Sequence, residues 1–525
     1  MRALRVLQPC LRSMGHKGGV RMRVCTAKQM NEADRFAIDV LGIPGTELMF
    51  HAASGLFEKI SAHFDDLSRK KMVILAGNGN NAGDGFALAT LACEADMLVS
   101  IVRVNTRDLS EDAAYYAAQI QDIPVCFFDQ NAEECKRWIG EADVIVDAMY
   151  GTGFRGSLSG AASVCAEIAN RCPALRVAAD LPSGVCCDTG AVDGVAFRAN
   201  LTVTFTAKKP CHFLYPAAEY CGRVEVCDIG IPERVLDDGR MWEITPALVK
   251  SVLPSRPSNS HKGTFGRLLT YCGSEDMTGA AVLCVGAALH TGVGLVEVAG
   301  PASVIAAVSA YHPEPIYTRL PETAEGDHAL MVAAGRAKAI VCGCGLSQAV
   351  GQERRITSLI RHASCPIVVD ADGITALSRN IDIIASHDKE LVLTPHPLEM
   401  ARLIGKTVEE IQADRIGTAC AFAQKHRVTV VLKGANTVVA APDGRVWLNA
   451  AACSALAKGG SGDVLSGVIG ALLAQGVDAP WAAVIGVYIH AQAGLIGAEK
   501  MTEYCLLPSQ LHEFFPDVFR QIKEG

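Results

Sequence analysis

The sequence lacks the features that mark a membrane-spanning or nucleic-acid-binding chain. Only 6% of its 525 residues are aromatic and 20% are charged, and the formal net charge is −8. Without a basic excess there is no reason to expect nucleic acid or an anionic membrane as a partner. No apolar run reaches the roughly 18 residues that would suggest a membrane span. We therefore expect a cytoplasmic protein without nucleic-acid or membrane partners.

The cysteines also lack the spacing of a metal site. There are 20 of them, but no paired CxxC motifs, and neither Cys186-Cys187 nor Cys342-Gly343-Cys344 has a His pair nearby. A disulfide framework is typical of short secreted chains rather than of one this long. The sequence therefore predicts reduced thiols that act as small apolar side chains.

A chain of this length is too long for one ordinary core, so we expect at least two domains. Short apolar strands alternate with helical stretches, which indicates parallel sheets with right-handed crossovers. We expect helical structure over 26–60, broken at Pro44-Gly45, and over 86–94, 465–474 and 482–498. The expected strands are 71–76, 97–104, 142–149, 175–181, 201–205, 267–271, 294–299, 339–342, 366–370, 391–394 and 429–433.

The polar, proline-containing stretch 253–260 has the composition of a linker. We place the first domain at 22–235, the linker at 236–256 and the second domain at 257–522. Residues 1–21 are rich in Lys and Arg and contain no acidic residue. We expect them to be an extension or to follow from a misplaced start.

A glycine-rich loop at 77–85 follows the strand at 71–76. Its glycines allow backbone N–H groups to approach a phosphate, and Asn80 and Asn81 add side-chain amides. Asp84 is suited to accept a hydrogen bond from a ribose hydroxyl. A purely structural turn is the alternative. Two further strands end in Asp147 and Asp180, and such ends meet at one edge of a parallel sheet, so they favour a binding site.

The segments 80–85, 147–153 and 180–184 resemble the YjeF N-terminal domain, a family that epimerises hydrated NADH and NADPH (NADHX and NADPHX). This resemblance covers about 22–232 and implies a Rossmann-like three-layer sandwich. It implies that the potassium ligands are Asn81, Asp147 and Ser183. It implies that the residues that bind the hydrated nucleotide are Asn80, Asn81, Ala82, Gly83, Asp84, Gly151, Thr152, Gly153, Phe154, Arg155, Gly156, Ser157 and Asp180, with Asp180 catalytic.

The implied reaction is reasonable chemically. The C6 hydroxyl of the hydrate lies beside a ring nitrogen, so its loss gives an iminium ion, and ring opening gives an aldehyde. Either route lets the hydroxyl return on the other face, and a carboxylate such as Asp180 can move the proton and stabilise positive charge. Where the family often has Met-Glu, this chain has Met49-Phe50-His51. We expect His51 to be a packed or exposed helix residue rather than a base.

A second glycine-rich segment, 458–463, precedes the predicted helix at 465–474. A helix start of this kind attracts phosphoryl oxygens, and Asp463 is placed to take a proton from an attacking hydroxyl. The segment is not a Walker loop, and close glycine packing is the alternative. Lys433 is suited to meet a phosphate, and His396 lies between two prolines beside Glu399.

With 262–266, 273–281 and 287–295, these segments resemble the ribokinase-like NAD(P)HX dehydratase domain over about 257–507. The resemblance implies a ribokinase-like three-layer sandwich and ADP- or ATP-driven dehydration of S-NAD(P)HX, with Mg²⁺ bridging the phosphates. It implies that Asp463 is catalytic and that Ala280, Gly345, His396 and Asp463 contact the hydrate. It implies that the adenine nucleotide contacts Lys433, Gly434, Ala435, Asn436, Thr437 and Gly462.

Two segments depart from this pattern. Cys344 and Ser347 lie where the family usually has Gly-Pro-Gly-Leu-Gly, and Leu398 replaces the glycine of His-Pro-Gly-Glu. We expect the bulkier Leu398 to alter the fit around His396. The glycine-rich segment that contains Asp463 is intact.

These resemblances predict a bifunctional α/β repair enzyme whose first reaction feeds its second. The fused layout resembles bacterial versions and favours ADP over ATP as donor. We also expect a homo-oligomer. The alternatives are a vitamin-precursor kinase with an attached nucleotide-binding domain, and a nucleotide-binding scaffold with one inactive half.

Overall fold

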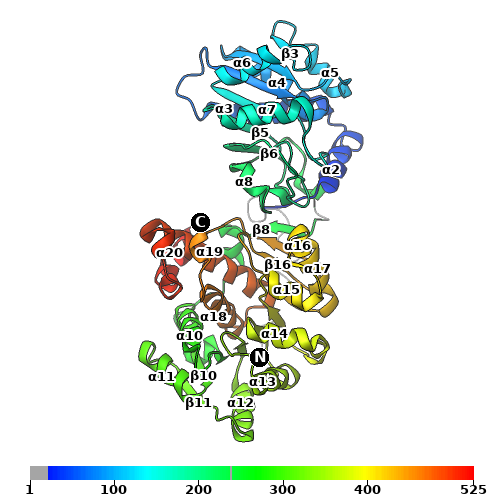
Figure 1. Cartoon of the computed structure of the whole chain (residues 1–525). Helices are drawn as coiled ribbons and strands as arrows, with labels where there is room; N and C mark the ends of the chain where they lie inside the picture. The colour runs from blue at the N-terminus through cyan, green and yellow to red at the C-terminus, as the bar shows by residue number, and fades with distance from the viewer. Residues whose placement is uncertain (1–21, 237–238, 525) are drawn as a thin grey trace. The chain divides into compact units, whose positions relative to one another are not determined.

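Two parallel sheets, one in each of two units, form the framework of the chain (Figure 1). The computed structural model describes residues 22–236 and 239–524. The first unit is Arg23–Gly239, and the second includes Arg240–Gly525. The expected extension at 1–21 lies outside the described residues.

The first unit contains a seven-stranded sheet in the order β3-β2-β1-β4-β5-β6-β7, with every neighbouring pair parallel. This is the open, doubly wound arrangement that alternating strands and helices predict. Its elements are α2 (Ala27–Asp39), α3 (Gly45–Ser61), β1 (Lys71–Ala76), α4 (Asn80–Glu94), β2 (Leu98–Arg103), α5 (Glu111–Ala117), β3 (Val125–Phe127), α6 (Ala132–Glu141), β4 (Val144–Ala148), α7 (Gly160–Arg171), β5 (Leu175–Ala179), β6 (Leu201–Phe205), α8 (Ala218–Cys221) and β7 (Arg223–Cys227).

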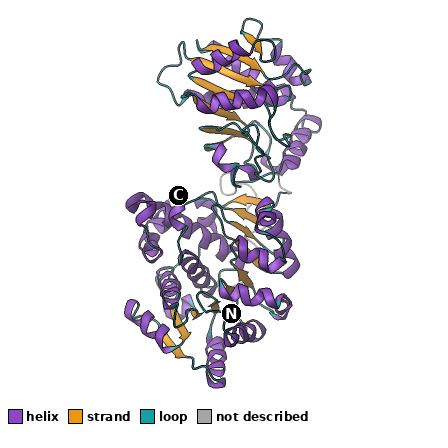
Figure 2. Cartoon of the chain, viewed as in Figure 1, coloured by secondary structure: helices purple, strands orange, loops and turns teal. Residues whose placement is uncertain are grey.

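Alternating side chains of these strands build a core on each face of the sheet. Met72 and Ile74 of β1 pack with residues of α2, α3 and α4, whereas Val73 and Leu75 pack with residues of α6 and α7. The strands are buried on both faces and therefore read as continuous apolar runs. The result is a three-layer sandwich, with helices covering both faces of the sheet (Figure 2).

The second unit contains a ten-stranded sheet in the order β11-β10-β9-β12-β13-β14-β15-β16-β17-β8. It is parallel from β11 to β15, turns antiparallel through β16 and β17, and ends with β8 parallel to β17. Its strands are β8 (Met241–Glu243), β9 (Arg267–Tyr271), β10 (Leu295–Gly300), β11 (Ile316–Arg319), β12 (Ala339–Cys342), β13 (Ile367–Val369), β14 (Leu391–Leu393), β15 (Thr429–Leu432), β16 (Val438–Ala440) and β17 (Val446–Leu448).

Helices cover both faces of this sheet as well (Figure 1). One face packs on α9 (Pro246–Val252), α10 (Thr278–His290), α11 (Ala302–Tyr311), α18 (Ser461–Ala474), α19 (Ala479–Cys505) and α20 (Phe515–Glu524). On the other side are α12 (Ala324–Arg336), α13 (Val350–His362), α14 (Asp372–Arg379), α15 (Pro397–Ile404), α16 (Val408–Ala413) and α17 (Arg415–His426).

Among the described residues, α19 is the one helix long and apolar enough to cross a membrane. However, 72% of its most apolar window is buried inside the protein. Its side chains Val484, Ile485 and Ile489 belong to the core of the second unit. The apolar composition of α19 is thus explained by burial within the fold.

The stretch expected to be a linker, 236–256, instead contributes two elements to the second unit. β8 forms the edge strand beside β17, and Trp242 stacks on Trp447 with ring centroids 5.8 Å apart. α9 follows and buries Leu248 and Val249. A strand of three residues is too short for a clear alternating pattern. The prolines of the stretch 253–260 lie C-terminal to both elements.

α10 and α18 approach so closely that a side chain at one position would collide with backbone. A Cβ added to Gly467 of α18 would lie 2.1 Å from the Cys284 carbonyl oxygen of α10. Gly335 of α12 has no heavy atom within 4 Å of such a Cβ. The two glycines are therefore under different constraints, although both lie within helices.

We expect Gly467→Ala to lower the free energy of unfolding of the second unit by about 2 kcal/mol or more, because overpacking forces the two helices apart. Gly335→Ala should leave it unchanged or raise it by up to about 1 kcal/mol through helix propensity. Denaturant titration followed by tryptophan fluorescence measures both. Equal effects of the two substitutions would contradict the close packing of α10 and α18.

Candidate active sites

The loops after β1, β4 and β5 line one cavity of about 430 Å³ in the first unit. This convergence is the one expected at the carboxyl edge of a parallel sheet. Of the predicted residues, those that line the cavity are Asn80, Asn81, Asp84, Gly151, Thr152, Gly153, Phe154 and Asp180. Those outside its lining are Ala82, Gly83, Arg155, Gly156 and Ser157.

Several glycines of the first loop serve packing as well as the cavity. A Cβ on Gly77 would lie 2.1 Å from the Met149 carbonyl oxygen, so the loops after β1 and β4 touch. On Gly85 it would lie 2.9 Å from the Ala148 Cβ. Gly79, in contrast, has open space and precedes the uncapped first turn of α4. Close packing therefore explains some glycines of this loop, and its binding role stays a prediction.

Asp180 forms a buried ion pair with Lys209, which follows β6. The same Asp180 oxygen accepts hydrogen bonds from the Thr204 hydroxyl at 3.0 Å and the Phe205 amide at 3.2 Å. Burial alone would raise the pKa of Asp180, but Lys209 and these donors bring it below its usual value. Asp180 is therefore ionised at neutral pH, and its φ of 68° is unusual outside glycine.

Three more carboxyls, Asp34, Asp84 and Asp112, line the same cavity, and two of them have raised pKa values. Asp84 of α4 has a pKa well above its ordinary value because of burial and the charges of Asp180 and Asp34. Burial and Asp180 also raise the pKa of Asp34 of α2, to about 6. Since Lys209 already pairs with Asp180, the cavity combines one ionised carboxylate with carboxyls that retain a proton more readily.

Asp147 and Ser183, two of the predicted potassium ligands, lie in direct contact. The Ser183 hydroxyl and amide each donate to a different oxygen of Asp147, both at 2.7 Å. Asp147 is fully buried, and burial raises its pKa to about 6. Among residues 22–236 and 239–524, no Lys or Arg forms an ion pair with it, so a cation there would offset a buried charge.

The third predicted ligand, Asn81, is buried, and its Nδ2 atom has no hydrogen-bond partner within the described structure. It lies beside the Gly151 loop, since a Cβ on Gly151 would be 3.7 Å from the Asn81 side chain. Oxygen donors from Asn, Asp and Ser suit a hard cation. The three residues thus fit a potassium ion chemically.

The remaining predictions near this cavity have structural explanations. Arg155 is exposed, donates to the carbonyls of Thr152 and Phe154, and pairs with Asp188. It holds the loop in shape and faces solvent. His51 donates through Nδ1 to the Ile229 carbonyl at 2.9 Å. This contact agrees with its interpretation as a packed helix residue.

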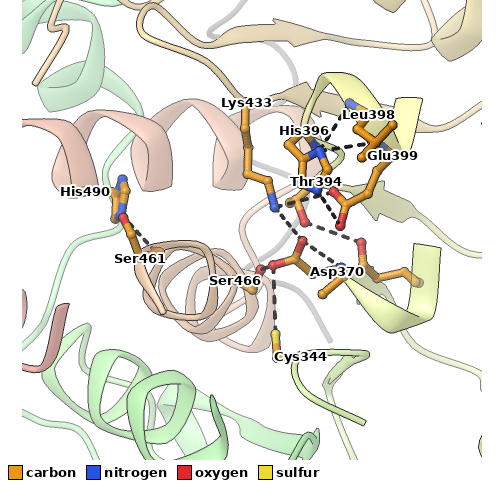
Figure 3. A network of polar contacts seen from close by, with 12 residues as sticks. Cys344, Asp370, Thr394, His396, Leu398, Glu399, Lys433, Ser461, Ser466 and His490 are labelled. Carbon is orange, nitrogen blue, oxygen red and sulfur yellow. Dashed lines mark hydrogen bonds and ion pairs between the residues drawn. The ribbon is translucent and has the colours of Figure 1, made fainter. Parts of the chain in front are cut away.

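The second unit has a corresponding ion pair, between Asp370 after β13 and Lys433 after β15, with an N–O distance of 2.7 Å (Figure 3). The other Asp370 oxygen accepts from the Ser466 hydroxyl of α18 at 2.7 Å. Burial would raise the pKa of Asp370, but Lys433 and these hydrogen bonds lower it. Lys433 is therefore held at the site by a carboxylate.

Gly460 is the N-cap of α18 and has a φ of 99°, and Asp463 lies in the first turn of this helix. Burial and the nearby Asp370 charge raise the pKa of Asp463 to about 7. A carboxylate with this pKa is well matched to accept a proton near neutral pH. Gly462 lies next to the ion pair, because an added Cβ would be 3.3 Å from Lys433 Nζ.

His396 caps helix α15. Its Nδ1 accepts from the amides of Leu398 and Glu399 at 3.2 and 3.3 Å, and its own amide donates to Glu399 at 2.8 Å. Burial and Lys433 lower the pKa of His396, so the ring is neutral. Leu398 is 45% exposed, so its side chain extends toward solvent (Figure 3).

The glycine-rich loops of this unit are held by close contacts. Gly345 has a φ of 59°, and an added Cβ would lie 2.7 Å from the Ala280 Cβ, so these two predicted hydrate contacts adjoin. Lys458 donates to the carbonyls of Glu503, Tyr504 and Leu506. It therefore anchors the end of α19 and is not directed at a phosphate.

The predicted nucleotide segment, Lys433 to Thr437, forms the turn between β15 and β16. The buried Arg415 donates to the carbonyls of Leu432 and Lys433 at 3.1 and 3.3 Å and so holds the backbone of this turn in place. Gly434 and Ala435 are exposed, whereas Asn436 is buried. The segment thus presents backbone beside Lys433.

Sequence reasoning did not assign roles to Asp34, Lys209 or Asp370. Asp370 ends a predicted strand, as Asp147 and Asp180 do, so the same rule would have found it. Lys209 is 29 residues from Asp180, and Asp34 lies in a helix that precedes every strand of its sheet. Neither spacing is a recognisable pattern, and only the folded chain brings these residues to the cavity.

Both halves of the chain match described families. Residues 268–516 match the family described as NAD(P)H-hydrate dehydratase, and residues 45–211 match the YjeF-related protein N-terminus. A relative named bifunctional NAD(P)H-hydrate repair enzyme Nnr, from Moorella thermoacetica, is 34% identical, with 96% of this chain and 98% of the relative covered. One of the same name from Escherichia coli is 32% identical, with 92% of each covered.

Among solved structures, the second unit is similar to an ADP/ATP-dependent NAD(P)H-hydrate dehydratase from Bacillus subtilis, co-crystallised with ATP and Mg²⁺. The identity is 32%, the TM-score is 0.49, and the match covers 53% of this chain and 98% of that one. The near full-length matches include both halves of the chain, which supports the repair interpretation over the vitamin-precursor kinase.

We expect Lys209→Met to lower the free energy of unfolding of the first unit by about 3 to 5 kcal/mol, because it leaves Asp180 buried without a partner. The double variant Lys209→Met/Asp180→Asn should recover much of this loss. Denaturant titration at neutral pH measures both, and Lys28→Met, at a side chain 84% exposed, is the control. If the double variant were as unstable as Lys209→Met, the loss would not come from the unpaired charge.

Proposed function

This chain belongs to the family of bifunctional NAD(P)H-hydrate repair enzymes, and we propose that its first unit epimerises R- and S-NAD(P)HX while its second unit dehydrates the S form to NAD(P)H. The separate family matches of the two units support this division most directly. The geometry that supports catalysis in both is a buried Asp–Lys pair beside a carboxyl with a raised pKa. The substrates are NADHX and NADPHX with ADP or ATP, and the working compartment is the cytoplasm. Homo-oligomerisation stays a prediction.

In the first unit, the ionised Asp180 stabilises positive charge that develops on the nicotinamide ring when the C6 hydroxyl leaves. Lys209 holds this carboxylate in its ionised form and in one orientation. Asp84, whose pKa is raised well above its ordinary value by burial and by neighbouring carboxylates, supplies a proton to the departing hydroxyl, with Asp34 beside it. Return of water to the other face and of the proton to Asp84 completes the epimerisation.

The remaining residues of this site bind the rest of the hydrated nucleotide. The first turn of α4, with Asn80 and Asn81, and the loop from Gly151 to Phe154 present backbone N–H groups to phosphate oxygens. Asn81, Asp147 and Ser183 would hold a potassium ion, which would supply positive charge close to the phosphates. The buried charge of Asp147 supports this assignment.

In the second unit, Asp463 takes the proton from the C6 hydroxyl as that oxygen attacks the terminal phosphorus of the nucleotide. The phosphorylated hydroxyl is then a good leaving group, and the ring nitrogen expels it as phosphate to leave an iminium ion. Loss of a proton from C5 to solvent then gives NAD(P)H. The start of α18, with Gly462, and the segment from Lys433 to Thr437 bind the nucleotide, while Ala280, Gly345 and His396 border the hydrate.

Mg²⁺ would neutralise charge on the nucleotide phosphates, and Asp463 and the nearby Asp370 form an acidic surrounding that suits it. Lys433 keeps Asp370 ionised and adds a positive charge near the phosphates. We propose ADP as the preferred donor. Parallel assays with ADP and ATP, each with and without a chelator of Mg²⁺, test the donor and the metal together.

We expect Asp180→Asn and Asp463→Asn to separate the two reactions. Racemic NADHX is incubated with Mg²⁺ and ADP, and NADH is followed by its absorbance. The unaltered protein should convert all of the substrate, whereas Asp180→Asn should stop when the S form is exhausted. In Asp463→Asn the rate of NADH formation should fall by at least about 100-fold. The variant should still interconvert the epimers, which chromatography separates.

The exposed Asp443, which pairs with Arg445, supplies the control substitution Asp443→Asn. It should behave as the unaltered protein in both assays. Full conversion by Asp180→Asn would remove the epimerase role of that residue. Phosphorylation of a vitamin alcohol without recovery of NADH would favour the kinase alternative.

The pH dependence of dehydration should report Asp463. Since a base must be unprotonated, kcat/KM should rise with pH and level off above a pKa of about 7. In Asp370→Asn, the removal of a neighbouring negative charge and the release of Lys433 both lower the pKa of Asp463. The rising limb should therefore move to lower pH, whereas in Asp443→Asn it should not move. An unmoved limb in Asp370→Asn would show that another group is titrating.

A further inference from the structure

Three cysteines from three separate elements converge beside the second site. Cys272 follows β9, Cys284 lies within α10, and Cys344 lies in the loop after β12. All three side chains are fully buried, and their sulfur atoms lie within 4.8 Å of one another. Since α10 packs over the sheet, the cluster is closed on every side by core residues except where Cys344 borders the site.

This spacing is suited to a metal ion bound by thiolates. Zn²⁺ binds thiolate sulfur at about 2.3 Å, so three sulfur ligands around it are separated by roughly 4 Å. Soft thiolate ligands favour Zn²⁺ and its heavier relative Cd²⁺ over Mg²⁺. Among the described residues, this is the one group of three cysteines whose sulfur atoms all lie within 4.8 Å of one another.

Cys344 connects this cluster to the carboxylates of the site. Its sulfur and the carboxylate oxygens of Asp370 and Asp463 also lie within 4.8 Å of one another. Asp370 is already bound by Lys433 and Ser466, so Cys344 is the thiol through which the cluster adjoins Asp463. Asp463 is only partly buried, whereas the three thiols are fully buried.

We propose that Cys272, Cys284 and Cys344 form a binding site for a thiophilic divalent cation of the Zn²⁺ class, and that its occupation suppresses dehydration while leaving epimerisation intact. Suppression follows because the cation and its thiolates change the charge beside the Asp463 carboxylate, which lies within 4.8 Å of the Cys344 sulfur and which we assign as the base. Hydrogen bonds among the thiols and burial raise the pKa of all three, so binding displaces protons from them.

Binding is tested first, independently of any activity. Zn²⁺ is titrated into the reduced full-length protein in competition with a chromophoric chelator, and Cd²⁺ binding is followed by its thiolate charge-transfer absorbance. The tightest site should weaken by at least about tenfold in Cys284→Ala and in Cys272→Ala. Cys365→Ala is the matched control, since Cys365 is a buried cysteine of the same unit outside the cluster.

Inhibition is tested second and rests on the proposed function. Zn²⁺ should inhibit NADH recovery by the unaltered protein and by Cys365→Ala, with epimerisation unaffected. Cys284→Ala should retain dehydration and need at least about tenfold more Zn²⁺ for the same inhibition. Circular dichroism verifies that each variant is folded, and Cys272→Ala repeats the test from a second element.

The outcomes distinguish this proposal from the function itself. Equal Zn²⁺ affinity in the unaltered protein, Cys284→Ala and Cys272→Ala would overturn the metal site, whatever the activity. Weaker binding in these variants with equal Zn²⁺ inhibition would overturn the link to Asp463. Failure of the unaltered protein to recover NADH without Zn²⁺ would overturn the proposed function and leave the binding result standing.

Discussion

A buried aspartate paired with a lysine determines the electrostatics of both candidate sites. In each unit the aspartate ends a central parallel strand, and the lysine follows a strand farther along the same sheet. The positive charge of the lysine is therefore already neutralised by its partner aspartate. A further carboxyl in the same place, Asp84 in one unit and Asp463 in the other, therefore experiences burial and a negative neighbour, and its pKa rises.

This arrangement places two carboxyls with opposite pKa shifts at the carboxyl edge of each sheet. The paired aspartate stays ionised and can stabilise positive charge, whereas its neighbour has a raised pKa and retains a proton more readily. Chemistry on the hydrated nicotinamide ring needs both capabilities, because the C6 hydroxyl must lose or gain protons while charge develops on the ring nitrogen. Parallel sheets supply the geometry, since the ends of their strands meet at one edge.

Much of the fold could be predicted from apolar periodicity. The strands β1, β6, β9 and β12 were predicted with the bounds that the structure shows, and Pro44-Gly45 separates α2 from α3 as expected. Short or exposed strands such as β3, β8 and β11 were missed because they are too brief for a recognisable pattern.

The candidate residues Asp147, Asp180 and Asp463 could be singled out because strand ends and helix starts have sequence signals. Lys209 and Asp34 were not, because their partners are distant in sequence, and Lys458 proved to be an anchor for carbonyls.

The position of β8 determines where the two halves can be separated. Although it comes directly after the first unit in the chain, its backbone completes the sheet of the second, and Trp242 covers Trp447. Division of the gene at residue 256 would strip this border strand, expose an unpaired strand edge and an indole face, and favour aggregation. A freestanding dehydratase half must therefore keep the residues from Arg240 onward.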